Sequence, residues 1–291
     1  MNDAIMEALL DTIKDTATLI PFLFITYLAM EWLEDKTEDQ SVALLSRMGK
    51  ASHIIGAGIG LIPQCGFSAA AAGLYSGGVI TVGTMLAVFL STSDEMLPIF
   101  ISSSVGAGPI LKILCMKFAF ALVTGITIDI AVRAFALNLG GDKHIHDLCE
   151  QDHCGCEDEE GGIVRSALVH TIKITIFIFI ASLIIGLIAE SLGKDVVASV
   201  LSGAPVLGTF ICSLVGLIPN CAASVIIAEL YLENIISSGQ MMAGLLVSAG
   251  VGILVLCRSN RNRKENALII AMLYFSGVIW GLLTDIIGVT F

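Results

Sequence analysis

Two copies of one short motif place an amide beside a thiol within apolar sequence. Residues 60–65 read Gly-Leu-Ile-Pro-Gln-Cys, and residues 216–221 read Gly-Leu-Ile-Pro-Asn-Cys. Proline removes a backbone donor and stops a helix, and the carbonyls at such a break can bind an ion together with the N-terminus of the next half-helix. Amide and carbonyl oxygens suit hard ions such as manganese, whereas thiolates suit zinc, cadmium, copper(I) or arsenite. The motifs predict an ion site and leave its ion open.

The alternative for each motif is a packing role. A proline kink followed by small residues, such as the four alanines at 69–72, allows helices to approach closely. Because both copies keep the amide and the thiol, we favour the ion pathway. Its predicted residues are Pro63, Gln64, Cys65, Ser68, Pro219, Asn220, Cys221 and Ser224.

Three acids inside apolar runs have no counterpart in the other half of the chain. Asp94 and Glu95 follow Ser-Thr-Ser, and Glu229 stands where the first half has Gly73. Buried carboxylates are costly, so we predict that these three act as cation ligands or proton carriers. For Asp94 and Glu95 the alternative is an interfacial loop, because Pro98 and the serines permit a turn.

Two further acids, Asp129 and Asp285, recur in both halves near segment ends. Capping or gate contacts are as reasonable for them as ion ligation. His53 precedes the first motif and is either a ligand, a proton carrier or a packed histidine. We group these three residues as a candidate gate or proton relay.

A hydrophilic linker at residues 140–162 is the second candidate metal site. Imidazole and thiolate groups at close spacing bind zinc, cadmium and similar ions, although this spacing is not that of a zinc finger. The alternative is a disordered acidic connector. The predicted ligands are His144, His146, Cys149, His153, Cys154 and Cys156.

The composition requires a membrane environment for these sites. Of the 291 residues, 56% are hydrophobic and 14% are charged, whereas a soluble domain carries about a quarter charged residues. Repeated apolar runs of membrane-spanning length predict an all-α polytopic membrane protein in a lipid bilayer. The acidic N-terminus lacks the features of a signal peptide, and nucleic-acid binding has no support because the chain has no basic stripe outside one short loop.

The two halves match at a nearly constant offset. Cys65 and Cys221 are 156 residues apart, as are Asp129 and Asp285. The match predicts two repeats, residues 1–139 and 163–291, with five segments each and about ten in total. The helices are expected to be broken or re-entrant at the motifs, and the apolar runs 79–101 and 235–257 count as one segment each. An odd number of segments inverts the second repeat relative to the first, whereas a simple kink at the motif would make the repeats parallel.

Basic residues favour the inverted arrangement in the cytoplasmic membrane. The loop from Arg258 to Lys264 carries four basic residues and should face the cytosol. In the inverted arrangement this loop places the linker in the cytosol and both chain termini outside. Basic residues that flank the linker agree with that orientation.

The paired motifs, the two five-segment halves and the histidine- and cysteine-rich linker resemble a bacterial and archaeal family of ten-transmembrane heavy-metal exporters. Members of that family are also labelled manganese transporters or arsenic efflux proteins. The resemblance extends over essentially the whole chain, and it implies a plasma-membrane permease without nucleotide-binding motifs. Consistently, the chain contains no phosphate-binding Gly-x-x-x-x-Gly-Lys-Ser/Thr loop.

The predicted function is a secondary transporter that exports a divalent transition-metal ion, with manganese favoured over zinc, in exchange for protons. We expect no required cofactor and no enzyme activity, since no nucleophile–base arrangement is present. One alternative is an efflux permease for arsenite or organoarsenicals that uses the paired thiols. Another is a membrane metal sensor or regulatory protein. The sequence leaves open the transport direction, the coupling ion and homo-oligomer formation.

Overall fold

The computed structural model describes residues 12–14, 16–21, 23–29, 52–93, 96–135, 163–192 and 205–291. Within these ranges the regular structure is entirely helical, as the predicted fold class requires. The predicted linker site lies outside them, as do Asp94 and Glu95.

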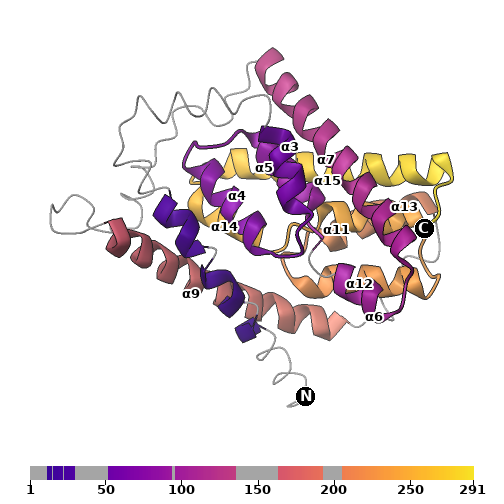
Figure 1. Cartoon of the computed structure of the whole chain (residues 1–291), viewed down its shortest axis with the longest axis horizontal. Helices are drawn as coiled ribbons and strands as arrows, with labels where there is room; N and C mark the ends of the chain where they lie inside the picture. The colour runs from indigo at the N-terminus through magenta and orange to yellow at the C-terminus, as the bar shows by residue number, and fades with distance from the viewer. Residues whose placement is uncertain are drawn as a thin grey trace.

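In the first half, five helices follow a helical stretch within residues 12–29. They are α3 (Ser52–Gly60), α4 (Gly66–Ser76), α5 (Val82–Ser91), α6 (Met96–Ser102) and α7 (Ala107–Ala134) (Figure 1). The second half consists of α9 (Ile163–Leu192), α11 (Pro205–Gly216), α12 (Cys221–Leu232), α13 (Ser238–Val247), α14 (Val251–Ser259) and α15 (Arg263–Ile287). The helix order from α3 to α7 thus repeats from α11 to α15.

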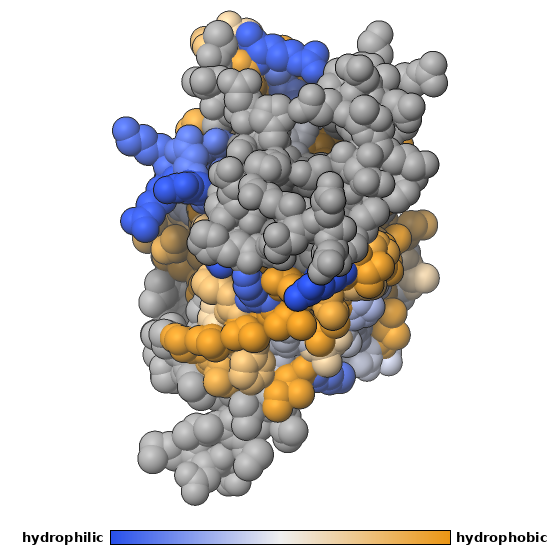
Figure 2. Space-filling model, turned by 90° about the vertical axis from the view of Figure 1, so that its left-hand side faces the viewer, coloured by the Kyte–Doolittle hydropathy of each residue, from blue (hydrophilic) through white to orange (hydrophobic). Residues whose placement is uncertain are grey.

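Five stretches of the described chain are long and apolar enough to cross a membrane. They are Val82–Ser102, Ala107–Ala134, Ala167–Ile184, Ser238–Ser259 and Arg263–Ile287. Exposed apolar side chains follow one face of α9 at every fourth residue from Val164 to Ile184, a spacing that places them on one stripe of a helix. Figure 2 shows apolar side chains gathered in a band across one face of the molecule. This is the surface of a multi-pass membrane protein.

Both halves pack in the same way around a buried helix. In the first half α5 packs against α3 and α7, and in the second α13 packs against α11 and α15. Every residue of α5 and of α13 is buried, and these two helices also contact each other. The two halves thus share this packing among the described helices, and the inverted repeats stay a prediction.

The short helix after each motif packs against the opposite half. Helix α4 lies against α14, and α12 lies against α6. At each motif the chain leaves the helix before the proline: α3 ends at Gly60 and α11 ends at Gly216. The next helices begin only at Gly66 and Cys221. The chain is thus broken at both motifs, and the halves are interlocked.

The apolar runs at 79–101 and 235–257 are broken as well, although the sequence suggested one segment each. Helix α5 ends at Ser91 and α6 begins at Met96, while α13 ends at Val247 and α14 begins at Val251. Gly250 has a φ of 52°, a conformation that glycine adopts without steric cost. Pro98 lies in the first turn of α6, where its missing N–H costs no helical hydrogen bond.

The first glycine of each motif allows two helices to cross closely. A Cβ on Gly60 would lie 2.5 Å from the Val88 carbonyl oxygen of α5. A Cβ on Gly216 would overlap the Gly244 carbonyl oxygen of α13. Val88 and Gly244 are themselves 156 residues apart, so the same crossing occurs in both halves.

We therefore expect Gly60→Ala to destabilise the protein, because the added methyl group collides with the α5 backbone. Overpacking of this kind costs about 1–3 kcal/mol. Gly58→Ala is the matched control on the same helix, since nothing lies within 4 Å of its Cβ position. The midpoint of thermal unfolding of the detergent-purified protein should fall for Gly60→Ala and stay level or rise for Gly58→Ala. Equal midpoints for the two variants would contradict the close crossing.

Candidate functional site

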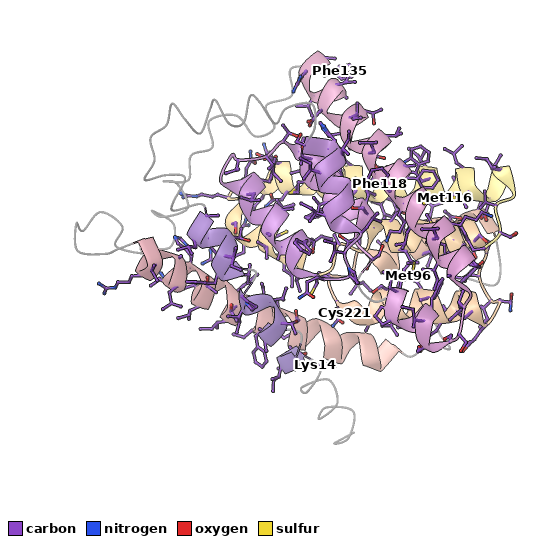
Figure 3. The ribbon with its side chains drawn as sticks, viewed as in Figure 1. Lys14, Met96, Met116, Phe118, Phe135 and Cys221 are labelled. Atoms are coloured by element: carbon purple, nitrogen blue, oxygen red, sulfur yellow. The ribbon has the colours of Figure 1, made fainter. Side chains whose placement is uncertain are left out.

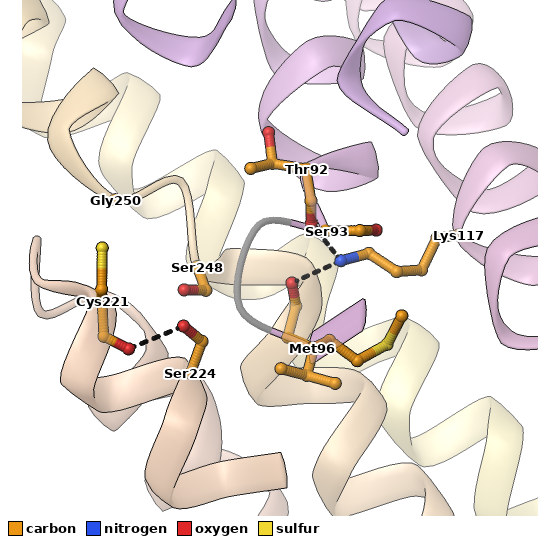
Figure 4. Close-up of a pocket in the computed structure, with 9 residues that line it drawn as sticks. Thr92, Ser93, Met96, Lys117, Cys221, Ser224, Ser248 and Gly250 are labelled. Carbon is orange, nitrogen blue, oxygen red and sulfur yellow. Dashed lines mark hydrogen bonds between the residues drawn. The ribbon is translucent and has the colours of Figure 1, made fainter. Parts of the chain in front are cut away.

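A small pocket lies at the point where the two newly found helix breaks meet. It is bounded by the ends of α5 and α13, the starts of α6, α12 and α14, and the middle of α7 (Figure 4). The pocket has an empty volume of about 310 Å³, which includes space open to the surroundings, and its interior has room for about one water molecule. The lining residues are Thr92, Ser93, Met96, Lys117, Cys221, Ser224, Leu245, Ser248 and Gly250.

The pocket lining is rich in oxygen donors. Four of its residues carry hydroxyl groups, and the carbonyl oxygens of Thr92 and Leu245 lie at the ends of α5 and α13. One thiol, from Cys221, and one thioether, from Met96, add softer donors. Figure 3 places Met96 and Cys221 in the body of the molecule, whereas Phe135 lies at the far end of α7. A mixed set of this kind suits a transition-metal ion.

The second motif forms one wall of this pocket. Cys221 is the first residue of α12, and the Ser224 hydroxyl donates to the Cys221 carbonyl at 2.9 Å. The Asn220 side chain caps α12 by accepting from the Ala222 N–H at 2.9 Å. Its amide nitrogen lies 3.5 Å from the Ser182 carbonyl oxygen of α9. The amide of Asn220 thus fixes the helix start, while Cys221 and Ser224 line the pocket.

The first motif shares the serine contact of the second but lacks its side-chain cap, and it does not line the pocket. The Ser68 hydroxyl donates to the Cys65 carbonyl at 2.8 Å, as in the second copy. Ser68 is fully buried against Gly252 of α14. Gln64 is partly buried, and Pro63 is exposed. A shared role of both motifs in one ion pathway stays a prediction.

The predicted acids are placed unequally. Glu229 is partly buried on α12 and is not among the pocket residues. Asp94 and Glu95 lie outside the described residues, but their neighbours Ser93 and Met96 both line the pocket. Within the described ranges, no three histidine, cysteine or acidic side chains come together as a metal cluster. The six predicted linker ligands fall outside those ranges.

Asp129 holds the start of α5 and contacts the predicted histidine. Its carboxylate accepts from the Thr81 hydroxyl at 2.6 Å and from the Gly83 N–H at 2.8 Å. The His53 Nε2 lies 2.9 Å from the same carboxylate, and both residues are buried. Three elements, α3, α5 and α7, are therefore joined at this carboxylate.

Asp285 makes the corresponding contacts in the second half, without a histidine. It accepts from the Ser237 hydroxyl and the Gly239 N–H, both at 2.8 Å. The position of His53 is taken by Thr209, because both residues pack against the equivalent glycines of α7 and α15. Both aspartates therefore accept hydrogen bonds at the start of a buried helix, as capping residues do. Of the two, Asp129 also contacts a histidine, His53.

Sequence reasoning missed Lys117, which is 1% exposed in the middle of α7. Its ammonium donates to the carbonyl oxygens of Thr92 and Leu245, the latter at 3.0 Å. The available signal was a basic residue inside an apolar span, which marks a functional candidate by default. Sequence reasoning also missed the buried hydrogen bond from Tyr75 of α4 to Glu265 of α15, which joins the two halves.

Comparison with known proteins identifies one family. A family model described as "Putative, 10TM heavy-metal exporter" matches residues 1–205 of the 291. This match confirms the resemblance found in the sequence, although it ends before the second motif. No curated protein and no solved structure matches the chain.

The unequal placement of the two motif thiols gives a direct test. We expect Cys221→Ala to lower cadmium flux about tenfold or more, because one bond to a soft ion is lost. Cys65→Ala is the matched control from the first motif and should change the flux by less than about twofold. Uptake of radiolabelled cadmium into inside-out vesicles measures both. Equal losses of cadmium flux in the two variants would show that both thiols have the same role, although Cys221 lines the pocket and Cys65 does not.

Proposed function

The chain belongs to this family of ten-transmembrane heavy-metal exporters, and from that premise we propose that it exports a divalent transition-metal ion across the cytoplasmic membrane. Manganese is the favoured ion, and protons are the favoured counter-substrate. The proposal rests most on the pocket between the two broken helices. Broken helices at membrane depth are the usual setting of an ion site in secondary transporters.

The pocket donors support a divalent ion over an arsenic compound. Carbonyl and hydroxyl oxygens outnumber the two sulfur donors, Cys221 and Met96, and oxygen ligands favour manganese. Arsenite binds through thiolates, and a single cysteine lines the described part of the pocket. Room for about one water molecule in the enclosed part also suits a bare ion better than an organoarsenical.

Proton coupling is supported by the titratable groups around the pocket helices. His53 and Asp129 form a buried pair at the start of α5, the helix whose far end borders the pocket. A histidine beside a carboxylate is a suitable proton carrier within a membrane. Asp94, Glu95 and Glu229 are further candidates as metal ligands or proton carriers, as we inferred from the sequence.

The linker and the charge distribution support export. With the Arg258–Lys264 loop in the cytosol, the linker also faces the cytosol and both termini lie outside. There the six histidine and cysteine side chains of the linker would collect metal and raise its local concentration at the inner entrance. A sensor, by contrast, would bind metal at the linker without moving it.

Flux into inside-out vesicles tests this proposal. Vesicles that contain the protein should accumulate radiolabelled manganese, and collapsing the proton gradient should reduce the accumulation. Vesicles from cells without the protein are the control. If manganese, zinc, cadmium, cobalt and arsenite all fail to move, the protein is not a transporter of this class.

The role of His53 can be separated from that of its structural environment. We expect His53→Gln to lower proton-driven manganese flux about tenfold or more, because a proton carrier is lost. It should spare manganese-for-manganese exchange, which needs no proton. Thr209→Val, at the equivalent place in the second half, is the control. A parallel loss of flux and exchange in His53→Gln would indicate a purely structural histidine.

Removal of the linker should weaken the apparent affinity of transport for the metal and leave the maximal flux nearly unchanged. We expect deletion of residues 143–159 to weaken uptake at low metal concentration while the maximal flux stays within about twofold of wild type, since the linker gathers the ion but does not carry it. Initial rates over a range of manganese concentrations separate the two quantities. Loss of maximal flux at unchanged half-saturation would instead place the transport step in the linker.

A further inference from the structure

We infer that Lys117 is a built-in competitor of the transported ion: in the empty carrier its ammonium occupies the carbonyl oxygens that the metal takes when it binds. This inference rests on the proposed function, and it names the residue that sets how tightly the site holds its ion.

Lys117 lies deep in the molecule. It is the eleventh of the 28 residues of α7, so roughly 16 Å of helix separate it from the N-terminal end of that span. Its side chain is 1% exposed. A lysine at such depth is costly and persists where it performs a function or meets strong acceptors.

Two acceptors of Lys117 are carbonyls that the helix breaks release. In a continuous helix the Leu245 carbonyl would accept from the N–H of residue 249. Here the Ala249 N–H bonds to the Val247 carbonyl instead, because α13 ends at Val247. Thr92 lies just beyond the last residue of α5. Each carbonyl thus stands at the negative end of a helix, the arrangement that binds cations in transporters with broken helices.

The ammonium and a metal ion cannot both use these oxygens. In Figure 4 Lys117 reaches the carbonyls from one side of the pocket, and Cys221 and Ser224 lie on the other. A divalent ion bound between these walls would be within a few ångströms of the ammonium, where the two like charges repel each other. The metal must therefore displace Lys117 from the carbonyls, and Lys117 must return when the metal leaves.

Only one half of the molecule carries this cation. The residue 156 positions after Lys117 is Leu273, which is equally buried on α15. Lys117 also joins the halves, because Thr92 follows α5 of the first half and Leu245 belongs to α13 of the second. The lysine therefore stabilises the empty carrier in a closed packing of both halves. It also keeps metal binding weak enough for release, as transport requires.

The test measures binding and transport separately in Lys117→Gln, Lys117→Met and Lys117→Arg. Lys112→Gln is the matched control, since Lys112 is an exposed lysine of the same helix that donates to the Thr290 carbonyl, outside the pocket. Manganese binding to the purified full-length proteins gives the Kd. Proteoliposomes give manganese-for-manganese exchange and net flux, and thermal unfolding shows whether each variant is folded.

Loss of the competing charge should lower the manganese Kd by at least about tenfold in Lys117→Gln and Lys117→Met. Manganese-for-manganese exchange should persist in these two variants. Their net flux should fall about tenfold, because the empty carrier no longer has a cation on its carbonyls. Lys117→Arg and Lys112→Gln should bind as the wild type does. Lys117→Met keeps an unbranched apolar stem one heavy atom shorter than that of lysine, and it serves where the Gln variant does not fold.

Two results overturn the inference, and they can be told apart. The first is that the wild type binds metal and both neutral variants bind it equally well or more weakly. This would show that Lys117 positions the ligand or only supports the fold. Failure of the wild type to bind or move manganese, zinc, cadmium or cobalt would overturn the proposed function, and this inference with it.

Discussion

Backbone carbonyls released at a helix break must find a partner inside a membrane, and this requirement organises the centre of the molecule. An unsatisfied polar group costs several kcal/mol in a hydrocarbon environment. Helices α5 and α13 both end within the buried core, and their terminal carbonyls meet at one place. Lys117 supplies the hydrogen bonds there. The pocket exists because two helices stop at this depth.

The surrounding scaffold is symmetric, whereas the chemistry is not. Equivalent glycines allow the same helix crossings in both halves, and Asp129 and Asp285 hold the starts of α5 and α13 in the same way. The reactive groups lie on one side only. Lys117 has a leucine as its counterpart, His53 has a threonine, and the thiol of Cys221 lines the pocket while that of Cys65 does not. Among the described residues, the two halves thus share a packing arrangement while the pocket between them is asymmetric.

The sequence predicted the scaffold better than it predicted the site. Composition and apolar run lengths gave the all-helical membrane class, and the prolines of the two motifs indicated where helices break. The break after α13 was not predicted, since no proline stands at residues 248–250, whereas a turn between α5 and α6 was one of the two alternatives that the serines and Pro98 left open. The role of Lys117 depends on a carbonyl 128 residues away, which no local pattern encodes. The two motif cysteines differ in their place at the helix start and in the lining of the pocket, and their nearly identical sequences could not distinguish them.

The central claim is that a metal ion takes the carbonyl site between the two broken helices and displaces Lys117 from it. Anomalous diffraction from crystals of the full-length protein grown with manganese tests this most directly. The account predicts a manganese peak between Thr92 and Leu245, close to Cys221, with the Lys117 side chain withdrawn from both carbonyls. An empty pocket with Lys117 still bonded to both oxygens, while manganese occupies another place along the helices, would contradict it.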